Sequence, residues 1–289
     1  MRRIFFLVLT ALVLSQCGEK QVTEVKIAEN TDPNEIIRIK GSETARKIIT
    51  SIDEFYQKTN STIPAEYSGG GSNLGIMSMM HGDADVIFVS RNLNNEELSF
   101  FNEKKFIIDT IAMDGLAIVV NHKNPLKSIN MQQLKGIYEG KILSWKEMGG
   151  PNQPIKVYSR ESTSGTYSLF KEKVLSNGNC LATHTSKNYN EDIVDEIKQD
   201  YYSIGYVGLG YTLGNELKVL GLLDSLNKNP ILPDFASIKS GDYPLKRYII
   251  AIYNGENKKI KNYITCIHNK NTYRIINESG FIPYKNNQE

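Results

Sequence analysis

The chain repeats one local pattern, in which a short apolar segment leads into a loop rich in glycine and hydroxyl residues and then into a segment with helical periodicity. Residues 36–40 are followed by a stretch whose apolar side chains Ile48, Ile49 and Ile52 fall on one helical face. Residues 84–89 are almost continuously apolar, as is typical of a buried strand in a parallel sheet. Repeated strand–helix units predict an α/β fold on a parallel-type sheet.

The rest of the chain continues this alternation. We expect further strands at 62–67, 155–158, 204–207 and 248–253, two extended apolar runs within 106–121, and helices over 165–174 and through 260–267. Because domains commonly have about 100–200 residues, a chain of 289 residues predicts two lobes. The composition, 40% apolar and 23% charged, is that of a globular protein and excludes a disordered or collagen-like chain.

The N-terminus has the form of an export signal. A basic start, Met-Arg-Arg, precedes an apolar run at 4–14 that is too short to span a bilayer, which is typical of a secretory signal peptide. The run ends in Leu-Ser-Gln-Cys17, which resembles a bacterial lipobox, so Cys17 would become the acylated first residue of an exported protein held at the periplasmic or cell-surface face of a membrane. The alternative is simple cleavage, with Cys17 lost or free. We expect a signal peptide at 1–16 and a polar tether at 17–33.

The net charge is small. Thirty-four Lys and Arg face 32 Asp and Glu, and the excess of +2 comes entirely from Arg2 and Arg3, which lie in the predicted signal peptide. A chain this close to neutral excludes a strongly basic nucleic-acid binder and predicts little long-range attraction of anions. Any anion binding must therefore depend on local groups.

Two further cysteines remain downstream of Cys17. In an exported protein, Cys180 and Cys266 are candidates for a disulfide. The alternative is two separate buried thiols, which is at least as well supported because the two residues are expected in different lobes.

Three loops share one design that suits an anion. Residues 41–44, 68–73 and 160–166 each follow a predicted strand, carry glycine and hydroxyl residues, and lead into a helix. A helix N-terminus offers unpaired N–H groups and a positive dipole end, and Arg160 adds a charged donor. Each loop alone is better explained by Ser or Thr as an ordinary N-cap with no ligand. Three such loops at the carboxyl ends of strands favour a pocket for a tetrahedral oxyanion.

The stretch at 134–150, Leu-Lys-Gly-Ile-Tyr-Glu-Gly-Lys-Ile-Leu-Ser-Trp-Lys-Glu-Met-Gly-Gly, resembles the conserved segment of the phosphate-binding proteins of bacterial ABC phosphate importers. Residues 160–166, Arg-Glu-Ser-Thr-Ser-Gly-Thr, are similar to the phosphate loop of that family. Further similarities lie at 41–44, 85–91, 204–208, 243–245 and 280–283. The resemblance covers nearly all of residues 36–284, with several motifs in the family's order.

The resemblance implies a two-lobed periplasmic-binding-protein fold of type II, with a mixed sheet flanked by helices in each lobe and phosphate in the cleft between them. Chain crossings near 119–122 and 247–249 would give lobe 1 residues 34–121 and 248–289, and lobe 2 residues 122–247. By motif position, the phosphate-binding residues would be Ser42, Thr44, Ser72, Ser90, Arg160, Ser164, Gly165 and Thr166.

Two residues depart from the family pattern. Glu43 stands where Ser or Thr is common, and a carboxylate beside phosphate is repulsive unless it points outward. Arg91 stands where some members have an Asp that accepts the proton of phosphate. Such an acceptor rejects sulfate, which has no proton to give. The remaining candidates for this selectivity acceptor are Glu43 and Asp114; the alternative for Asp114 is a turn residue before Gly115.

Together with the lipobox-like leader, the resemblance implies a monomeric, extracytoplasmic lipoprotein that captures inorganic phosphate and delivers it to ABC permease subunits, without a cofactor and without catalysis. The alternatives are a binder of sulfate or molybdate, and a surface lipoprotein that uses the fold for adhesion or sensing. Hydrolysis of a phosphate ester at Ser164 is disfavoured because no Gly-x-Ser-x-Gly motif or His/Asp pair accompanies it. The four histidines lack metal-ligand spacing, so no metal site is expected.

Overall fold

A computed structural model describes residues 35–60, 63–214, 216–223 and 229–284. The predicted signal peptide, the tether and the lipidation site at Cys17 lie outside the described residues. Within this part of the chain, no helix is long and apolar enough to cross a membrane.

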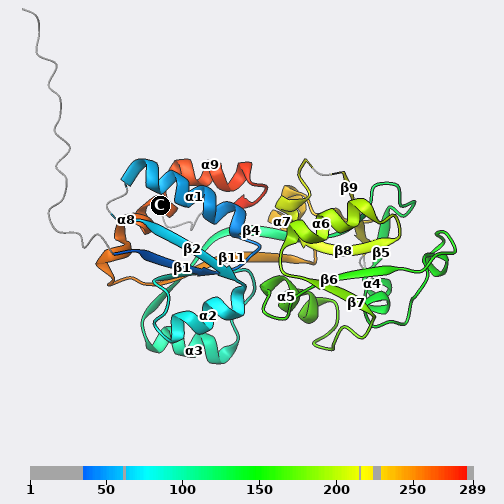
Figure 1. Cartoon of the computed structure of the whole chain (residues 1–289), viewed down its shortest axis with the longest axis horizontal. Coiled ribbons are helices and arrows are strands. Elements are labelled where there is room, and N and C mark those ends of the chain that lie inside the picture. The colour runs from blue at the N-terminus through cyan, green and yellow to red at the C-terminus, as the bar shows by residue number, and fades with distance from the viewer. Residues whose placement is uncertain (1–34, 61–62, 215, 224–228, 285–289) are drawn as a thin grey trace, which may run out of the picture.

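Two long strands connect the two halves of the molecule. β4 (Phe106–Asn121) pairs with β11 (Lys246–Asn254) over its first ten residues and then with β8 (Ser203–Gly208) and β9 (Leu217–Val219) over its last six. The sheet order is β2-β1-β3-β11-β4-β8-β6-β7, so one sheet continues from end to end of the molecule in Figure 1. The hydrogen-bonding partner of β4 changes between Gly115 and Leu116, where the two lobes meet.

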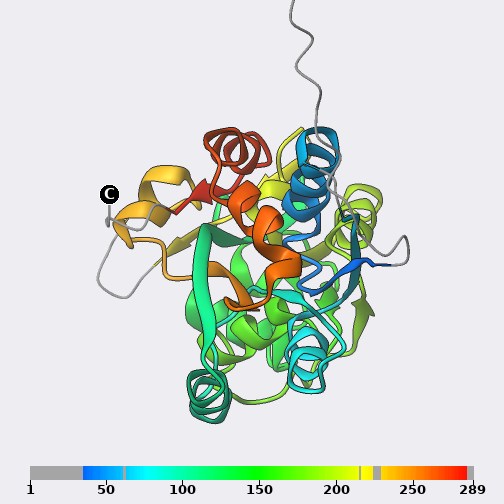
Figure 2. The same cartoon turned by 90° about the vertical axis from the view of Figure 1, so that its left-hand side faces the viewer.

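Lobe 1 has a sheet covered by helices on both faces. β1 (Ile37–Gly41) lies parallel to β2 (Ala65–Gly70) and β3 (Val86–Val89), and β11 runs antiparallel to β3. Seen from this end in Figure 2, the blue α1 and dark red α9 lie above the sheet, and the cyan α2 and teal α3 lie below it. The helices are α1 (Arg46–Asn60), α2 (Ser72–Met80), α3 (Asn95–Glu103), α8 (Lys261–Ile267) and α9 (Lys270–Glu278), with the 3₁₀ turn η3 (Lys258–Ile260) before α8. The short β12 (Ile282–Pro283) pairs with β4.

Lobe 2 repeats the arrangement on the other part of the sheet. β6 (Lys156–Arg160) lies parallel to β8 and to β7 (His184–Lys187). Its helices are α4 (Met131–Tyr138), α5 (Gly165–Lys173), α6 (Asn190–Gln199) and α7 (Phe235–Ser240), with 3₁₀ turns η1 (Trp145–Met148) and η2 (Leu209–Tyr211). β5 (Ser128–Asn130) and β10 (Gly221–Leu223) form a separate two-stranded parallel sheet.

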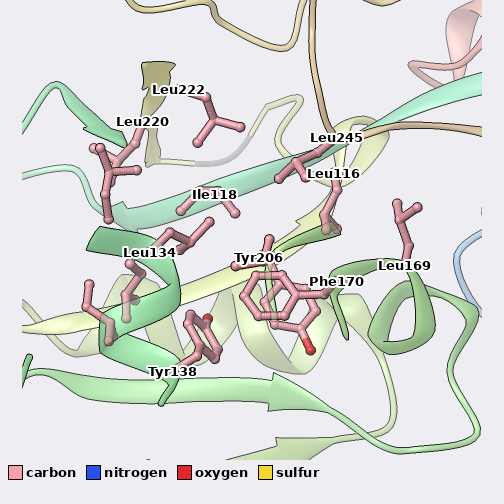
Figure 3. Close-up of a cluster of buried hydrophobic side chains, with 14 of the residues drawn as sticks. Leu116, Ile118, Leu134, Tyr138, Leu169, Phe170, Tyr206, Leu220, Leu222 and Leu245 are labelled. Carbon is pink, nitrogen blue, oxygen red and sulfur yellow. The ribbon is translucent and has the colours of Figure 1, made fainter. Parts of the chain in front are cut away.

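Each lobe has its own apolar core, which is the physical reason that the two lobes form. In lobe 2, the rings of Phe170 and Tyr206 stack with centroids 4.1 Å apart, next to Tyr138, as Figure 3 shows. In lobe 1, Tyr56 and Tyr263 meet edge to face at 5.2 Å. The apolar side chains therefore separate into clusters on either side of the partner change in β4, and polar loops are left between them.

The predicted two-lobed α/β class is confirmed, and the strand sequence of the first half is close to the prediction. The predicted parallel-type sheet is confirmed only in part. β4 and β11 run antiparallel to their neighbours, so the sheet is mixed. The turn alternative for Asp114 and Gly115 is wrong, since both residues lie inside the continuous strand β4. Cys180 and Cys266 are separate free thiols, and Cys266 is buried in the core of lobe 1.

Candidate functional site

A cavity of about 270 Å³ lies where the loops of the two lobes face each other. Lobe 1 contributes the loop after β1 and the end of β2, and lobe 2 contributes the end of β6, the loop before α5 and the residues before α6. The lining residues are Glu43, Gly70, Gly71, Arg160, Glu161, Thr163, Ser164, Asn188 and Tyr189. Two of the three loops singled out in the sequence supply most of this surface, and the third supplies Glu43.

Arg160 is a buried cation in the wall of this cavity. Its exposed fraction is 1%, and its Nε and Nη2 donate to the carbonyl oxygens of Lys187 and Asn188 at 3.2 and 2.5 Å. Its Nη1 has no hydrogen-bond partner, and within the described part of the chain no carboxylate forms an ion pair with it. Burial lowers the pKa of Arg160, with a contribution from the charge of Arg247. Buried charges in proteins are normally paired, so this guanidinium is suited to an anionic ligand.

The N-terminus of α5 lies beside Arg160. Ser164 caps the helix, since its Oγ accepts hydrogen bonds from the N–H groups of Thr166 and Tyr167 at 3.1 and 3.4 Å. The helix thus directs the positive end of its dipole to the same region as the guanidinium, while the N–H groups of Thr166 and Tyr167 are taken by the cap. The hydroxyl of Ser164 serves as a cap, which is the ordinary role of a serine at this position.

The predicted residues Ser72, Ser90 and Gly165 come together where this helix end meets lobe 1. Ser72 Oγ and Ser90 Oγ are 3.3 Å apart, and the N–H of Ser90 donates to Ser72 Oγ at 3.0 Å. A Cβ on Gly165 would collide with both hydroxyls, so only glycine allows the helix to approach this closely. Ser42 is also buried, and its Oγ accepts from the N–H of Ala45 at 3.2 Å.

Thr44 and Thr166 join the two lobes directly. Their hydroxyl oxygens are 2.6 Å apart, and both residues are fully buried. Thr166 Oγ1 also accepts from Arg247 Nη1 at 2.7 Å. Nearby, the N–H of Asn73 donates to the carbonyl of Thr163 at 3.3 Å, so the loops of the two lobes are in hydrogen-bond contact.

Glu43 lines the cavity with its charge already compensated. Its Oε1 accepts from the N–H of Gly70 at 2.6 Å, and its Oε2 accepts from Arg46 Nη2 and Nε at 2.6 and 2.7 Å. Arg46 in turn lies between the rings of Tyr67 of lobe 1 and Tyr189 of lobe 2, 5.1 Å from each centroid. The carboxylate therefore faces the cavity as part of an ion pair, which reduces its repulsion of an anion.

The other unusual residues are held away from the cavity. Arg91 forms a two-pronged pair with Glu97, at 2.7 and 2.8 Å, and donates to Asn73. Asp114 is not among the lining residues; its Oδ2 accepts from Arg247 Nη2 and Nε at 2.6 and 2.8 Å, and its Oδ1 accepts from the N–H of Leu209. Burial raises the pKa of Asp114, and the charge of Arg247 opposes that rise.

Sequence reasoning missed Arg247, Arg46 and Tyr189 as parts of this region. A signal for Arg247 exists, because the period of two along β11 places it on the same face as Ile249 and Ala251, which are fully buried. Arg46 and Tyr189 gave no such signal, since their contact depends on the approach of two lobes. No cluster of His, Cys, Asp or Glu among the described residues is arranged to hold a metal ion.

Two lobes that share one sheet, with a buried arginine, a helix N-terminus and several hydroxyls meeting between them, define a two-lobed solute-binding protein with an interlobe anion site. In agreement, residues 27–269 match the family described as the PBP superfamily domain. The chain belongs to this superfamily, and within it to the family of the PstS phosphate-binding proteins.

Relatives support this assignment over most of the chain. The phosphate-binding protein PstS of Staphylococcus saprophyticus is 32% identical over 230 residues, covering 77% of this chain and 70% of its own. PstS of Borreliella burgdorferi is 28% identical over 268 residues, covering 89% and 93% of the two chains. Among solved structures, a phosphate ABC transporter substrate-binding protein from Clostridium perfringens with bound phosphate has a TM-score of 0.76 at 25% identity, covering 87% of this chain and 100% of its own.

Proposed function

We propose that this protein captures inorganic phosphate between its two lobes and delivers it to the permease of an ABC importer. The observation that carries the proposal is Arg160, a buried guanidinium in the cavity wall that, among the described residues, has no partner at Nη1 and only carbonyl oxygens at its other nitrogens. A tetrahedral oxyanion would supply the missing negative charge and accept the free N–H, in the charge-assisted geometry that arginine favours.

The remaining groups suit the same ligand. Phosphate oxygens need several donors in place of water. Besides Arg160, the start of α5 reaches the cavity at Ser164, while the hydroxyls of Thr44, Thr166, Ser72 and Ser90 are buried at the contact between the lobes without lining the cavity in this arrangement. Because these donors come from both lobes, bound phosphate would hold the lobes together, as in hinge closure around a ligand. The names of the PstS relatives and the phosphate bound to the Clostridium perfringens protein support the choice of anion.

Isothermal titration calorimetry tests the proposal. We expect the wild type to bind one phosphate per chain, and Arg160→Met to weaken binding between about tenfold and a hundredfold, the range for a hydrogen bond to a charged group. Arg160→Lys keeps the charge without the fork and should bind with intermediate affinity. Arg38→Met is a matched control, because it removes an Arg–Asp pair with Asp85 at the amino ends of the strands, away from the cavity.

Three outcomes would overturn the proposal: a wild type that does not bind phosphate, a wild type that prefers sulfate or molybdate, or an Arg160→Met variant that binds as tightly as the wild type. Thermal denaturation of each variant shows that a loss of binding is not a loss of fold. A wild type without anion affinity would favour the adhesion or sensing alternative.

We also propose that the protein is a monomeric extracytoplasmic lipoprotein anchored through Cys17, and that it binds its ligand without chemical conversion. Lobe 1 would comprise 34–121 and 248–289, and lobe 2 would comprise 122–247. The anchor is supported by the lipobox-like sequence at the end of the apolar leader. Cys17→Ser should release the protein from the membrane fraction, and continued membrane association of that variant would contradict the anchor.

A further inference from the structure

A buried ion pair lies at the point where the two crossing strands meet the site. Arg247 and Asp114 are directly opposite each other on β11 and β4, next to the residue where β4 changes partner. Their exposed fractions are 3% and 1%, and two guanidinium nitrogens of Arg247 donate to one oxygen of Asp114. Two of the guanidinium nitrogens of Arg247 are used in this pairing across the two strands, but the third nitrogen, Nη1, is directed elsewhere.

That third donor reaches the pair of threonine hydroxyls that joins the two lobes. Arg247 Nη1 donates to Thr166 Oγ1 at 2.7 Å, and Thr166 Oγ1 is 2.6 Å from Thr44 Oγ1. A guanidinium has no acceptor, so the oxygen of Thr166 must accept this bond. The positive charge also repels the hydroxyl proton of Thr166, which is therefore turned away from Arg247 and toward Thr44 Oγ1.

From this geometry we propose that Arg247 and Asp114 are positioning residues for the anion site: they orient the Thr166 hydroxyl to donate to Thr44 Oγ1, which leaves the Thr44 hydroxyl as the hydrogen-bond donor. The inference rests on the proposed function. An anion requires donors, and a hydroxyl whose oxygen is already engaged is prepared to donate. Asp114 neutralises Arg247, so the orientation is obtained without a second net positive charge beside Arg160.

As a positioning residue, Asp114 would not be the acceptor for the proton of phosphate. Loss of an acceptor at Asp114 would weaken the binding of phosphate but not that of sulfate, which has no proton at neutral pH and which such an acceptor rejects. A positioning pair would affect both anions in the same proportion, since both require donors. The ratio of the two affinities therefore distinguishes the two roles.

The experiment replaces the whole pair rather than one member, because one buried charge without its partner destabilises a protein, whereas an apolar replacement of both is commonly tolerated. We expect Asp114→Leu/Arg247→Met to remain folded and to bind both phosphate and sulfate about tenfold more weakly, the effect of losing one hydrogen bond to a charged group. Arg38→Met, which removes a different Arg–Asp pair, should leave both affinities unchanged.

A double-mutant cycle with Thr166→Val shows whether the pair acts through that hydroxyl. Under the proposal, the pair replacement has little further effect on phosphate affinity when Thr166→Val is already present. Additive losses would overturn it, as would a pair replacement that binds like the wild type or that loses affinity for phosphate alone. A wild type that does not bind phosphate would refute the proposed function itself, which the same titration reveals separately.

Discussion

At the scale of the residue, Glu43 and Arg160 define the electrostatics of the site. Arg160 is buried without a carboxylate partner among the described residues, and Glu43 faces the same cavity as part of an ion pair with Arg46. The cavity wall thus combines one uncompensated cation with one compensated anion. Inorganic phosphate, which is partly protonated near neutral pH, can use both, because its oxygens accept from the cation and its own hydroxyl can donate to the carboxylate.

We therefore predict that Glu43 determines the preference for phosphate over sulfate. Glu43→Gln should reduce the phosphate-to-sulfate affinity ratio by about tenfold or more, because the amide offers a donor to sulfate and a weaker acceptor to the proton of phosphate. Competition calorimetry with both anions measures the ratio. Glu97→Gln, which alters an ion pair with Arg91 outside the lining of the cavity, is the control; an unchanged ratio in Glu43→Gln would contradict the prediction.

Several of these residues could be predicted from the sequence, and the reason is local. Arg160, Ser164, Gly165 and Thr166 lie at one strand-to-helix junction, where a contiguous motif sets their geometry. The environment of Asp114 could not be predicted, because an Asp-Gly pair commonly forms a turn and only the register of two distant strands places it opposite Arg247. Contacts fixed by register are not encoded in any single segment.

At the scale of the element, β4 and α1 have most influence on the architecture. β4 is a single strand of 16 residues, where the apolar pattern predicted two runs, and its continuity joins the lobes through one sheet. α1 packs against α8 through the ring pair Tyr56–Tyr263 and through a hydrogen bond of 2.5 Å from the Tyr263 hydroxyl to Asp53 Oδ1. The amphipathic pattern predicted α1, but its partner helix lies about two hundred residues away along the chain.

Ionisation of the Asp53 carboxyl should make the stability of the folded protein depend on pH. Burial raises the pKa of Asp53 from 3.8 to about 7, although the hydrogen bond from Tyr263 opposes the rise. The folded protein thus binds more protons than the unfolded chain between those two pH values, so stability should fall as the pH rises through this interval. Asp53→Asn, which cannot ionise and keeps an acceptor, should remove this contribution and raise the melting temperature at pH 8 by several degrees.

Thermal denaturation across pH 4 to 8 measures this effect. At pH 4 the variant should gain nothing over the wild type, since Asp53 is then protonated in the folded state. Asp195→Asn, on the exposed side of α6, is the control and should not change the pH profile. Equal destabilisation of Asp53→Asn at both ends of the range would contradict the prediction.

At the scale of the whole molecule, the two lobes meet through a small set of polar contacts. Thr44 contacts Thr166 across the interface, and the N–H of Asn73 donates to Thr163. Arg46 of lobe 1 also lies against the ring of Tyr189 of lobe 2, which lines the cavity. These contacts can form only when the lobes approach, and for that reason a reading of single segments could not find them.

The stacking of Arg46 on Tyr189 should slow the release of phosphate. A cation–π contact at a partly exposed site contributes about 0.5–1 kcal/mol, so Tyr189→Ala should accelerate dissociation about two- to fivefold. Association should change little, because the ring meets Arg46 only in the closed arrangement. Stopped-flow release into an excess of an unlabelled competitor measures the rate; Tyr201→Ala, which removes a ring packed on Tyr202 in the same lobe, is the control. An unchanged dissociation rate in Tyr189→Ala would contradict this role.

A crystal structure of the protein with arsenate tests the central claim most directly. Arsenate has the shape and charge of phosphate, and its anomalous scattering locates the anion independently of the surrounding density. The account predicts a single strong anomalous peak between the lobes, within hydrogen-bond distance of Arg160 Nη1 and the N-terminus of α5. A peak elsewhere on the molecule, or no peak at saturating arsenate, would contradict the assignment of this cleft as the oxyanion site.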